Sequence, residues 1–123
     1  MRITLSTLIQ QVAEEKPNAF KPAKLTSFIN DIESQVVEDL DTDKEFIPYD
    51  YAKDSGKLLI VPQPYARLYK SWLKAQIDFA NEDYESYANN LAQHNQDYAE
   101  YFDYIVRVGE AVNTTPTRFS NAF

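Results

Sequence analysis

The feature that most constrains this chain is a periodic row of eight residues between positions 84 and 108. The row advances by three and four residues alternately, which is the spacing of one face of a long helix. Its members are Tyr84, Tyr87, Leu91, His94, Tyr98, Tyr101, Ile105 and Val108. Four of the eight are tyrosines, whose rings are apolar but whose hydroxyl groups need water or a hydrogen-bond partner. The row therefore predicts a long helix that packs against another surface and stays partly hydrated, as in a subunit of a larger assembly.

Three other segments carry apolar residues at helical spacing. Either Thr4 or Ser6 is suited to cap the first of them, Pro17 to end it and Pro22 to begin the second. The sequence therefore predicts an all-α fold with four main helices near 4–16, 22–40, 65–81 and 83–108. The predicted core consists of Leu8, Ile9, Val12, Leu25, Phe28, Ile29, Ile32, Leu68, Trp72, Ala75 and Phe79.

Composition sets the scale of the fold. With 123 residues, of which 44% are hydrophobic and 25% charged, the chain is predicted to form a single domain over 1–123. The absence of cysteine excludes disulfides and thiolate metal sites. No apolar run has the length of a signal peptide or a membrane span, so we expect a soluble, cytoplasmic protein without a membrane partner.

The net charge of −7 is spread along the chain, and no segment has a basic surplus. Such a surface does not favour binding to phosphate backbones. A helix-turn-helix reading of the first two helices fails for the same reason, because the second carries four carboxylates, namely Asp31, Glu33, Glu38 and Asp39. The simplest role of the charge is to keep the protein soluble.

The sequence lacks a pattern suited to catalysis. His94 is the one histidine, and the two glycines are isolated, so di-iron motifs and phosphate-binding loops are excluded. Four carboxylates, Asp78, Glu82, Asp83 and Glu85, meet at the junction of the third and fourth helices, where solvated helix ends explain them more simply than a cation does. We therefore expect no enzyme, with no catalytic, cofactor-binding or metal-binding residues and no cofactor.

Residues 41–64 interrupt the helical pattern and contain three prolines. Two β-prone runs, 46–49 and 58–61, flank a turn signal at 53–56, which predicts a hairpin-like arm. Because two strands alone are marginally stable in water, the arm must lie on the helices or on a neighbouring chain. Since it carries so many apolar side chains, we expect it to contact a neighbouring subunit. The predicted inter-subunit residues are Phe46, Ile47, Tyr49, Tyr51, Leu58 and Ile60 from the arm, with Tyr84 and Tyr98 from the tyrosine row.

The C-terminal residues 110–123 have no helical period and are predicted to form an extended docking tail. Phe119 and Phe123 are suited to enter apolar pockets of a partner, and Arg118 beside them to pair with an acidic rim.

Residues 58–104 resemble small proteins of tailed phages and prophages of Gram-positive hosts. The resemblance is carried by Leu58-Leu59-Ile60-Val61-Pro62-Gln63-Pro64-Tyr65, by the run from Leu73 to Asn81, by Tyr84-Glu85-Ser86-Tyr87-Ala88-Asn89-Asn90, and by Asn95 to Tyr98 with Tyr101. The run Ile29-Asn30-Asp31-Ile32-Glu33 also fits the second helix of that family. These proteins are head–tail connectors, also called adaptor or head-completion proteins. They often carry a glycine near position 82, so Glu82 argues against a sharp turn there.

The resemblance implies a mostly helical structural virion protein at the head–tail interface, assembled in the cytoplasm of the bacterial host. It implies a homo-oligomeric ring of about a dozen copies below the portal protein, which extends the DNA channel and provides a platform for a tail-side stopper or tail-completion protein. DNA then passes without specific binding, and the tail of this chain, through Phe119, Phe123 and Arg118, docks on the portal.

The charge also fits a second class of protein, a small acidic phage-encoded binding protein or inhibitor that acts as a monomer or dimer. That alternative does not require the arm, the tyrosine row or an ordered tail.

Overall fold

The computed structural model describes residues 1–40 and 45–109. Its elements are β1 (Arg2–Thr4), α1 (Leu5–Glu15), α2 (Pro22–Asp39), α3 (Tyr51–Asp54), β2 (Leu58–Pro62), α4 (Arg67–Ala80) and α5 (Tyr84–Arg107). Helices account for 68% of the described residues, so the prediction of a mainly helical chain is confirmed. β2 coincides with the β-prone run predicted at 58–61, whereas β1 was not predicted.

Local sequence signals set several of the helix ends. The Thr4 hydroxyl accepts a hydrogen bond from the Thr7 backbone N–H at 3.2 Å and caps α1, while Pro22 occupies the first turn of α2. Asp83 caps α5 by accepting from the Ser86 backbone N–H at 3.3 Å. Gly109 follows α5 with a φ of 76°, a left-handed conformation that glycine adopts without strain.

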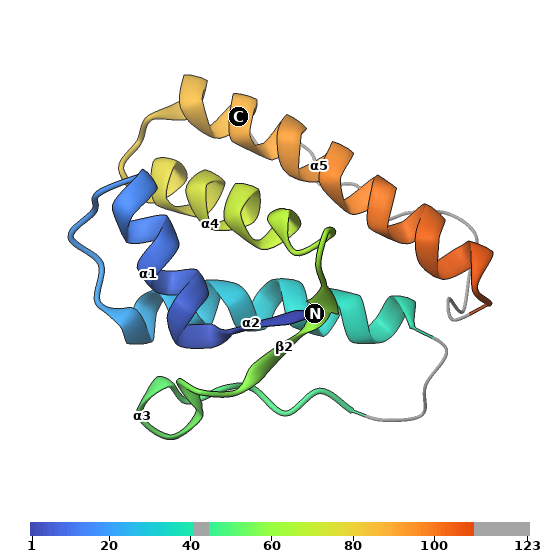
Figure 1. Ribbon diagram of the computed structural model, residues 1–123. Helices are drawn as coiled ribbons and strands as arrows, with labels where there is room; N and C mark the ends of the chain where they lie inside the picture. Colours follow the sequence, from blue (N-terminus) through green and yellow to red (C-terminus); the bar gives the residue numbers. More distant parts are fainter. Residues whose placement is uncertain (41–44, 110–123) are drawn as a thin grey trace.

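The helices are stacked in layers (Figure 1). α5 lies along α4, α4 lies between α5 and α2, and α1 crosses one end of the stack. The small sheet, α3 and residues 45–50 lie on the side of α2 that is remote from α5. This arrangement gives α4 neighbours on several sides, which is why its apolar stripe is wide.

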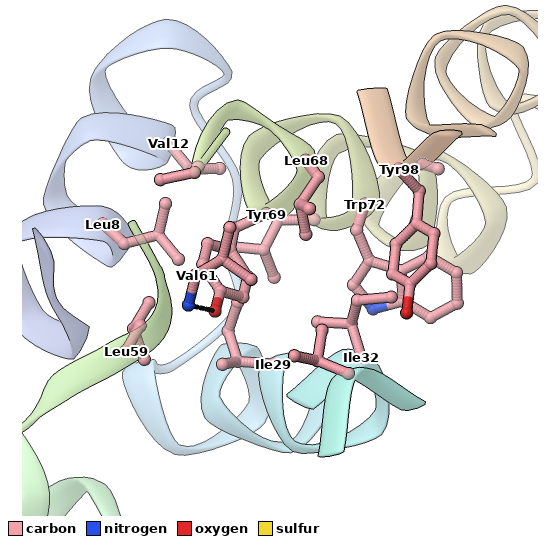
Figure 2. Close-up of a cluster of buried hydrophobic side chains, with 14 of the residues drawn as sticks. Leu8, Val12, Ile29, Ile32, Leu59, Val61, Leu68, Tyr69, Trp72 and Tyr98 are labelled. Atoms are coloured by element: carbon pink, nitrogen blue, oxygen red, sulfur yellow. Dashed lines mark hydrogen bonds between the residues drawn. The ribbon is translucent and has the colours of Figure 1, made fainter. Parts of the chain in front are cut away.

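One core joins all the layers, and Figure 2 shows its centre, where Leu8, Ile29, Leu59 and Trp72 come together from four elements. Of the predicted core residues, nine are buried and Phe28 is partly buried against the core. Phe79 was wrongly predicted, because its side chain is 43% exposed at the end of α4. That end leads into the turn to α5, and the Phe79 ring contacts Tyr84 and Tyr87 of α5.

The side chains of the tyrosine row are more deeply buried than its composition suggested. Its six central members, from Tyr87 to Ile105, are buried, and only the end members Tyr84 and Val108 are substantially exposed. The prediction of a partly hydrated helix face was therefore wrong for most of α5. The hydroxyl group of Tyr98 finds a partner inside the protein, because it donates a hydrogen bond to the buried carboxylate of Asp39.

The predicted hairpin within 41–64 is also wrong for the part of it that the structure describes. β2 pairs antiparallel with β1 at the start of the chain, and the partner run at 46–49 is not a strand. Leu59 and Val61 of β2 are fully buried in the chain's own core. A remote N-terminal segment thus supplies the pairing edge, which no local pattern within 41–64 encodes.

The turn between α4 and α5 is sharp despite the absence of glycine. Glu82 adopts a φ of 60°, and the Asp83 backbone N–H donates to the Asp78 carbonyl oxygen at 2.9 Å. The expectation that Glu82 would prevent a sharp turn was wrong. The left-handed conformation costs a non-glycine residue free energy, which the surrounding hydrogen bonds and helix packing offset.

Candidate functional site

A hollow of about 700 Å³ lies between the C-terminal end of α2, residues 45–49 and the start of β2. We refer to this hollow as the groove. Its lining is Arg2, Val37, Leu40, Glu45, Phe46, Ile47, Tyr49, Gly56, Lys57, Leu58 and Ile60. Its volume lies within the range typical of ligand-binding pockets, and most of its lining side chains are apolar.

Two apolar side chains of the groove face solvent to an unusual degree. Ile47 is 79% exposed and Leu58 is 47% exposed. Adjacent exposed aliphatic side chains around a hollow are typical of a protein-interaction surface, whereas single exposed apolar residues are ordinary.

The groove brings together five of the eight residues predicted to lie between subunits, namely Phe46, Ile47, Tyr49, Leu58 and Ile60. Tyr51 lies nearby on α3 and is partly buried against the core. Tyr84 is the first residue of α5, does not line the groove and is 42% exposed. Tyr98 is fully buried in the chain's own core, which leaves it no surface to offer to a second subunit in this fold.

Two polar residues of α2 fix the walls of the groove. The Asn30 side chain pairs twice with the Tyr49 backbone, because its Oδ1 accepts from the N–H at 2.8 Å and its Nδ2 donates to the carbonyl oxygen at 3.1 Å. Glu33 Oε2 accepts from the Tyr49 hydroxyl at 2.7 Å and from the Ile60 backbone N–H at 3.1 Å. Asn30 and Glu33 together form the clip, which ties residues 45–49 and β2 to the same helix.

Tyr69 of α4 completes the hydrogen bonding of the clip. Its hydroxyl group donates to Glu33 Oε1 and accepts from the Val61 backbone N–H at 2.9 Å (Figure 2). Both Glu33 and Tyr69 are fully buried. The Glu33 carboxylate therefore accepts hydrogen bonds from three donors, and one of them is the Ile60 backbone N–H of β2.

Burial raises the pKa of all three ionisable side chains in this hydrogen-bond network, Glu33, Tyr49 and Tyr69. Desolvation raises the pKa of Glu33 above its ordinary value of 4.5, although the hydrogen bonds from Tyr69, Tyr49 and Ile60 and the charge of Arg2 act in the opposite direction. Burial, with the nearby Glu33 carboxylate, raises the pKa of Tyr49 and of Tyr69. The two hydroxyl groups therefore remain protonated donors at neutral pH.

The rim of the groove is locally basic in an acidic protein. Arg2 and Lys57 both lie there, with Glu45 as the one carboxylate. Among residues 1–40 and 45–109, the cations Lys16, Arg67, Lys70 and Lys74 form ion pairs with carboxylates, and Arg2 and Lys57 do not. The Arg2 Nε–H donates instead to the Leu59 carbonyl oxygen at 2.6 Å, which holds its guanidinium at the edge of β2.

Other buried polar groups hold helices together. Asp97 of α5 accepts from the Ser71 hydroxyl at 2.9 Å, and Asp78 of α4 pairs with the Lys16 ammonium at 2.5 Å. His94 is buried, its Nδ1 lies 2.9 Å from the Leu68 carbonyl oxygen, and burial lowers its pKa to about 4. The imidazole is therefore neutral at physiological pH and acts as a packed core residue, in line with its place in the tyrosine row.

Two of the four carboxylates at the junction of α4 and α5 have separate structural partners. Asp78 binds Lys16 and accepts from the Asn90 amide at 2.6 Å, and Asp83 caps α5. Within the described part of the chain, no group of three or more His, Asp or Glu side chains is arranged to hold a metal ion. None of the helices in that part has the length and apolar character needed to cross a bilayer.

Sequence reasoning missed the clip, although a signal for it was present. Glu33 belongs to the same helical face as Ile29 and Val36, which are both fully buried. A carboxylate at an inward position of an amphipathic helix requires buried donors, and such a residue marks a tertiary polar contact. The predicted docking residues Arg118, Phe119 and Phe123 lie outside the described residues, as do positions 41–44 of the predicted arm.

The arrangement is suited to binding another protein segment, because an apolar hollow with a polar support and a basic rim offers contact area and orientation. Comparison of the chain with protein-family models, with curated protein sequences and with solved structures found no match.

Proposed function

We propose that this protein is a head–tail connector of a tailed phage or prophage, a structural virion protein that forms a ring of about a dozen copies below the portal. The class of protein is proposed from the resemblance of residues 58–104 to such connectors. The observation that carries the assembly role is the groove, where five predicted inter-subunit residues line one apolar hollow and two of them, Ile47 and Leu58, are exposed. A ring requires two different faces on each subunit, and the groove is the first of them.

In this proposal the ring extends the DNA channel and supports a tail-side stopper or tail-completion protein. The net charge of −7 favours passage of DNA without adhesion, because carboxylates repel phosphates. Residues 110–123 dock on the portal through Phe119, Phe123 and Arg118, and the protein resides at the head–tail interface of the virion after assembly in the bacterial cytoplasm. The finer division of the chain into four main helices, a 41–64 segment that contacts a neighbouring subunit and a docking tail belongs to the same proposal.

The first test changes the groove without changing the core. Leu58→Asp places a charge on a side chain that is 47% exposed, so we expect a folded protein that no longer assembles and leaves capsids without tails. Val106→Asp is the matched control, since Val106 is 38% exposed on α5 and does not line the groove. Measurements are circular dichroism for the fold, mass in solution with the portal protein, and tail attachment by electron microscopy.

Removal of residues 114–123 tests portal docking separately. We expect the truncated protein to keep its helical content and to lose portal binding. Normal tailed particles from Leu58→Asp and from the truncation would refute the connector proposal. A protein that stays a monomer or dimer in the presence of portal would favour the small acidic inhibitor instead.

A further inference from the structure

The turn between α4 and α5 combines exposed aromatic side chains with negative charge, whereas the groove is apolar with a basic rim. Phe79 and Tyr84 are 43% and 42% exposed, and their ring centroids lie 5.7 Å apart. The segment 79–85 contains three carboxylates and no cation, namely Glu82, Asp83 and Glu85. We refer to residues 79–85 as the acidic turn. The acidic turn joins α4 to α5 at one end of the molecule (Figure 1) and carries two exposed aromatic side chains and three carboxylates.

The acidic turn is a shaped surface rather than a loose connection. The Glu82 backbone N–H donates to the Phe79 carbonyl oxygen at 3.1 Å, and the Asp83 side chain is occupied in capping α5. Glu82 and Glu85 carry exposed side chains on either side of Asp83. A rigid projection with aromatic side chains loses little conformational entropy on binding, which favours its use as a contact surface.

The groove complements the acidic turn in apolar character and in charge. It is an apolar hollow, with Leu58 and Ile47 exposed, and its lining carries two cations, Arg2 and Lys57, against one carboxylate, Glu45. Aromatic rings entering an apolar hollow supply contact area, and opposite charges at the rim orient the partners and raise the association rate.

One molecule cannot bring these two surfaces together, because helices of the stack lie between them (Figure 1). We propose that the acidic turn of one copy docks in the groove of a second copy of this chain. The contact is heterologous, since each copy offers its turn to one neighbour and its groove to the other, and such contacts close into rings when the rotation between copies permits it. This inference rests on the proposed function and names the second face of the ring.

Cross-linking tests the contact directly because the chain contains no cysteine. We expect a short bifunctional maleimide to join Leu58→Cys to Tyr84→Cys when the two single variants are mixed, giving a dimer and no larger species. Each single variant alone should give no dimer, and the double variant should give a ladder of oligomers. Val106→Cys mixed with Leu58→Cys is the control for random collisions.

A charge exchange provides the second measurement. Lys57→Glu on the groove side, or Glu85→Lys on the turn side, should lower the yield of the cross-linked dimer about tenfold, an effect that weakens at high salt. Combining Lys57→Glu on one copy with Glu85→Lys on its neighbour should restore the yield. Both positions are exposed, so neither change is expected to disturb folding.

Several outcomes would overturn the contact. Dimers formed by either single variant alone would indicate a two-fold contact instead, and equal cross-linking of Leu58→Cys to Val106→Cys would show no preference for the acidic turn. The absence of 58–84 products in samples that assemble and bind portal would reject this contact but leave the connector role intact. Absence of both cross-linking and portal binding would reject the contact and the proposed function together.

Discussion

The α4–α5 pair and residues 45–62 are attached to the rest of the protein by different forces. α4 and α5 meet along a periodic face in which residues such as Leu73, Leu91 and Ile105 are almost completely buried. Residues 45–62 depend on two buried side chains of β2, Leu59 and Val61, and on the clip from α2. The first region is stabilised mainly by apolar burial, whereas the second combines the two buried side chains of β2 and its pairing with β1 with hydrogen bonds to Asn30 and to the buried Glu33 carboxylate.

The difference teaches where the molecule is sensitive. An apolar interface distributes its free energy over many contacts, each of modest size. At a buried carboxylate much of the stabilising free energy depends on one side chain, because loss of that acceptor leaves several buried donors without a partner. The groove is built from the second region, so its shape depends on polar residues that do not themselves line it.

The largest effect is expected from a change in the apolar region. Trp72→Ala removes a side chain that is 7% exposed and whose Nε1–H donates to the Phe28 carbonyl oxygen at 2.8 Å. We expect the free energy of unfolding to fall by about 3–5 kcal/mol, measured by urea denaturation. The loss should be global, with faster hydrogen exchange in all layers. A loss below about 1 kcal/mol would show that the burial of Trp72 contributes little.

An intermediate and local effect is expected from the clip. Glu33→Ala removes the acceptor for Tyr49, Ile60 and Tyr69, which should cost about 1–3 kcal/mol because buried donors lose their partner. Hydrogen exchange should accelerate in residues 45–62 before it does in α4 and α5.

Glu38→Ala is the matched control for the clip, since Glu38 is an exposed carboxylate on the same helix. It should change stability by less than about 0.5 kcal/mol. Equal acceleration of exchange in both regions of Glu33→Ala would contradict the division drawn here.

The smallest effects are expected from pH, and two carboxylates, Glu33 and Glu15, should respond with opposite sign. Burial raises the folded-state pKa of Glu33 above 4.5, so its contribution to stability is complete below 4.5 and is lost as the pH rises through the raised value. Hydrogen bonds from Lys70 and Lys74 lower the pKa of Glu15, between α1 and α4, to about 2. Its contribution is present above 4.5 and is lost as the pH falls towards 2.

Denaturation curves across pH separate the two carboxylates. Glu33→Gln should remove the loss of stability on the alkaline side of 4.5, and Glu15→Gln should remove part of the loss on the acidic side. Because the Glu15 side chain is 39% exposed, its substitution should cost only about 0.2–1 kcal/mol at neutral pH. A Glu33→Gln profile parallel to that of the unchanged protein would refute the assignment to Glu33.

The sequence by itself determined the helical character and most of the interior. Helices can be predicted from local sequence, because each of their signals involves residues close together in the chain. These signals are the apolar period, the caps at Thr4 and Asp83 and the prolines. The same local logic identified the apolar residues of the 41–64 segment as a feature in need of a partner. It also gave no means of deciding whether that partner was the chain itself or a neighbour.

Only the tertiary structure decided how that segment is used. Pairing of β2 with β1 joins positions more than fifty residues apart, and the clip joins α2 to Tyr49, Ile60 and Tyr69. Such contacts depend on the packing of the helices between them and leave no period in the sequence. The same packing buried Tyr98 and left Phe79 and Tyr84 exposed, because position along a helix fixes the face of a side chain but not which parts of that face another layer covers.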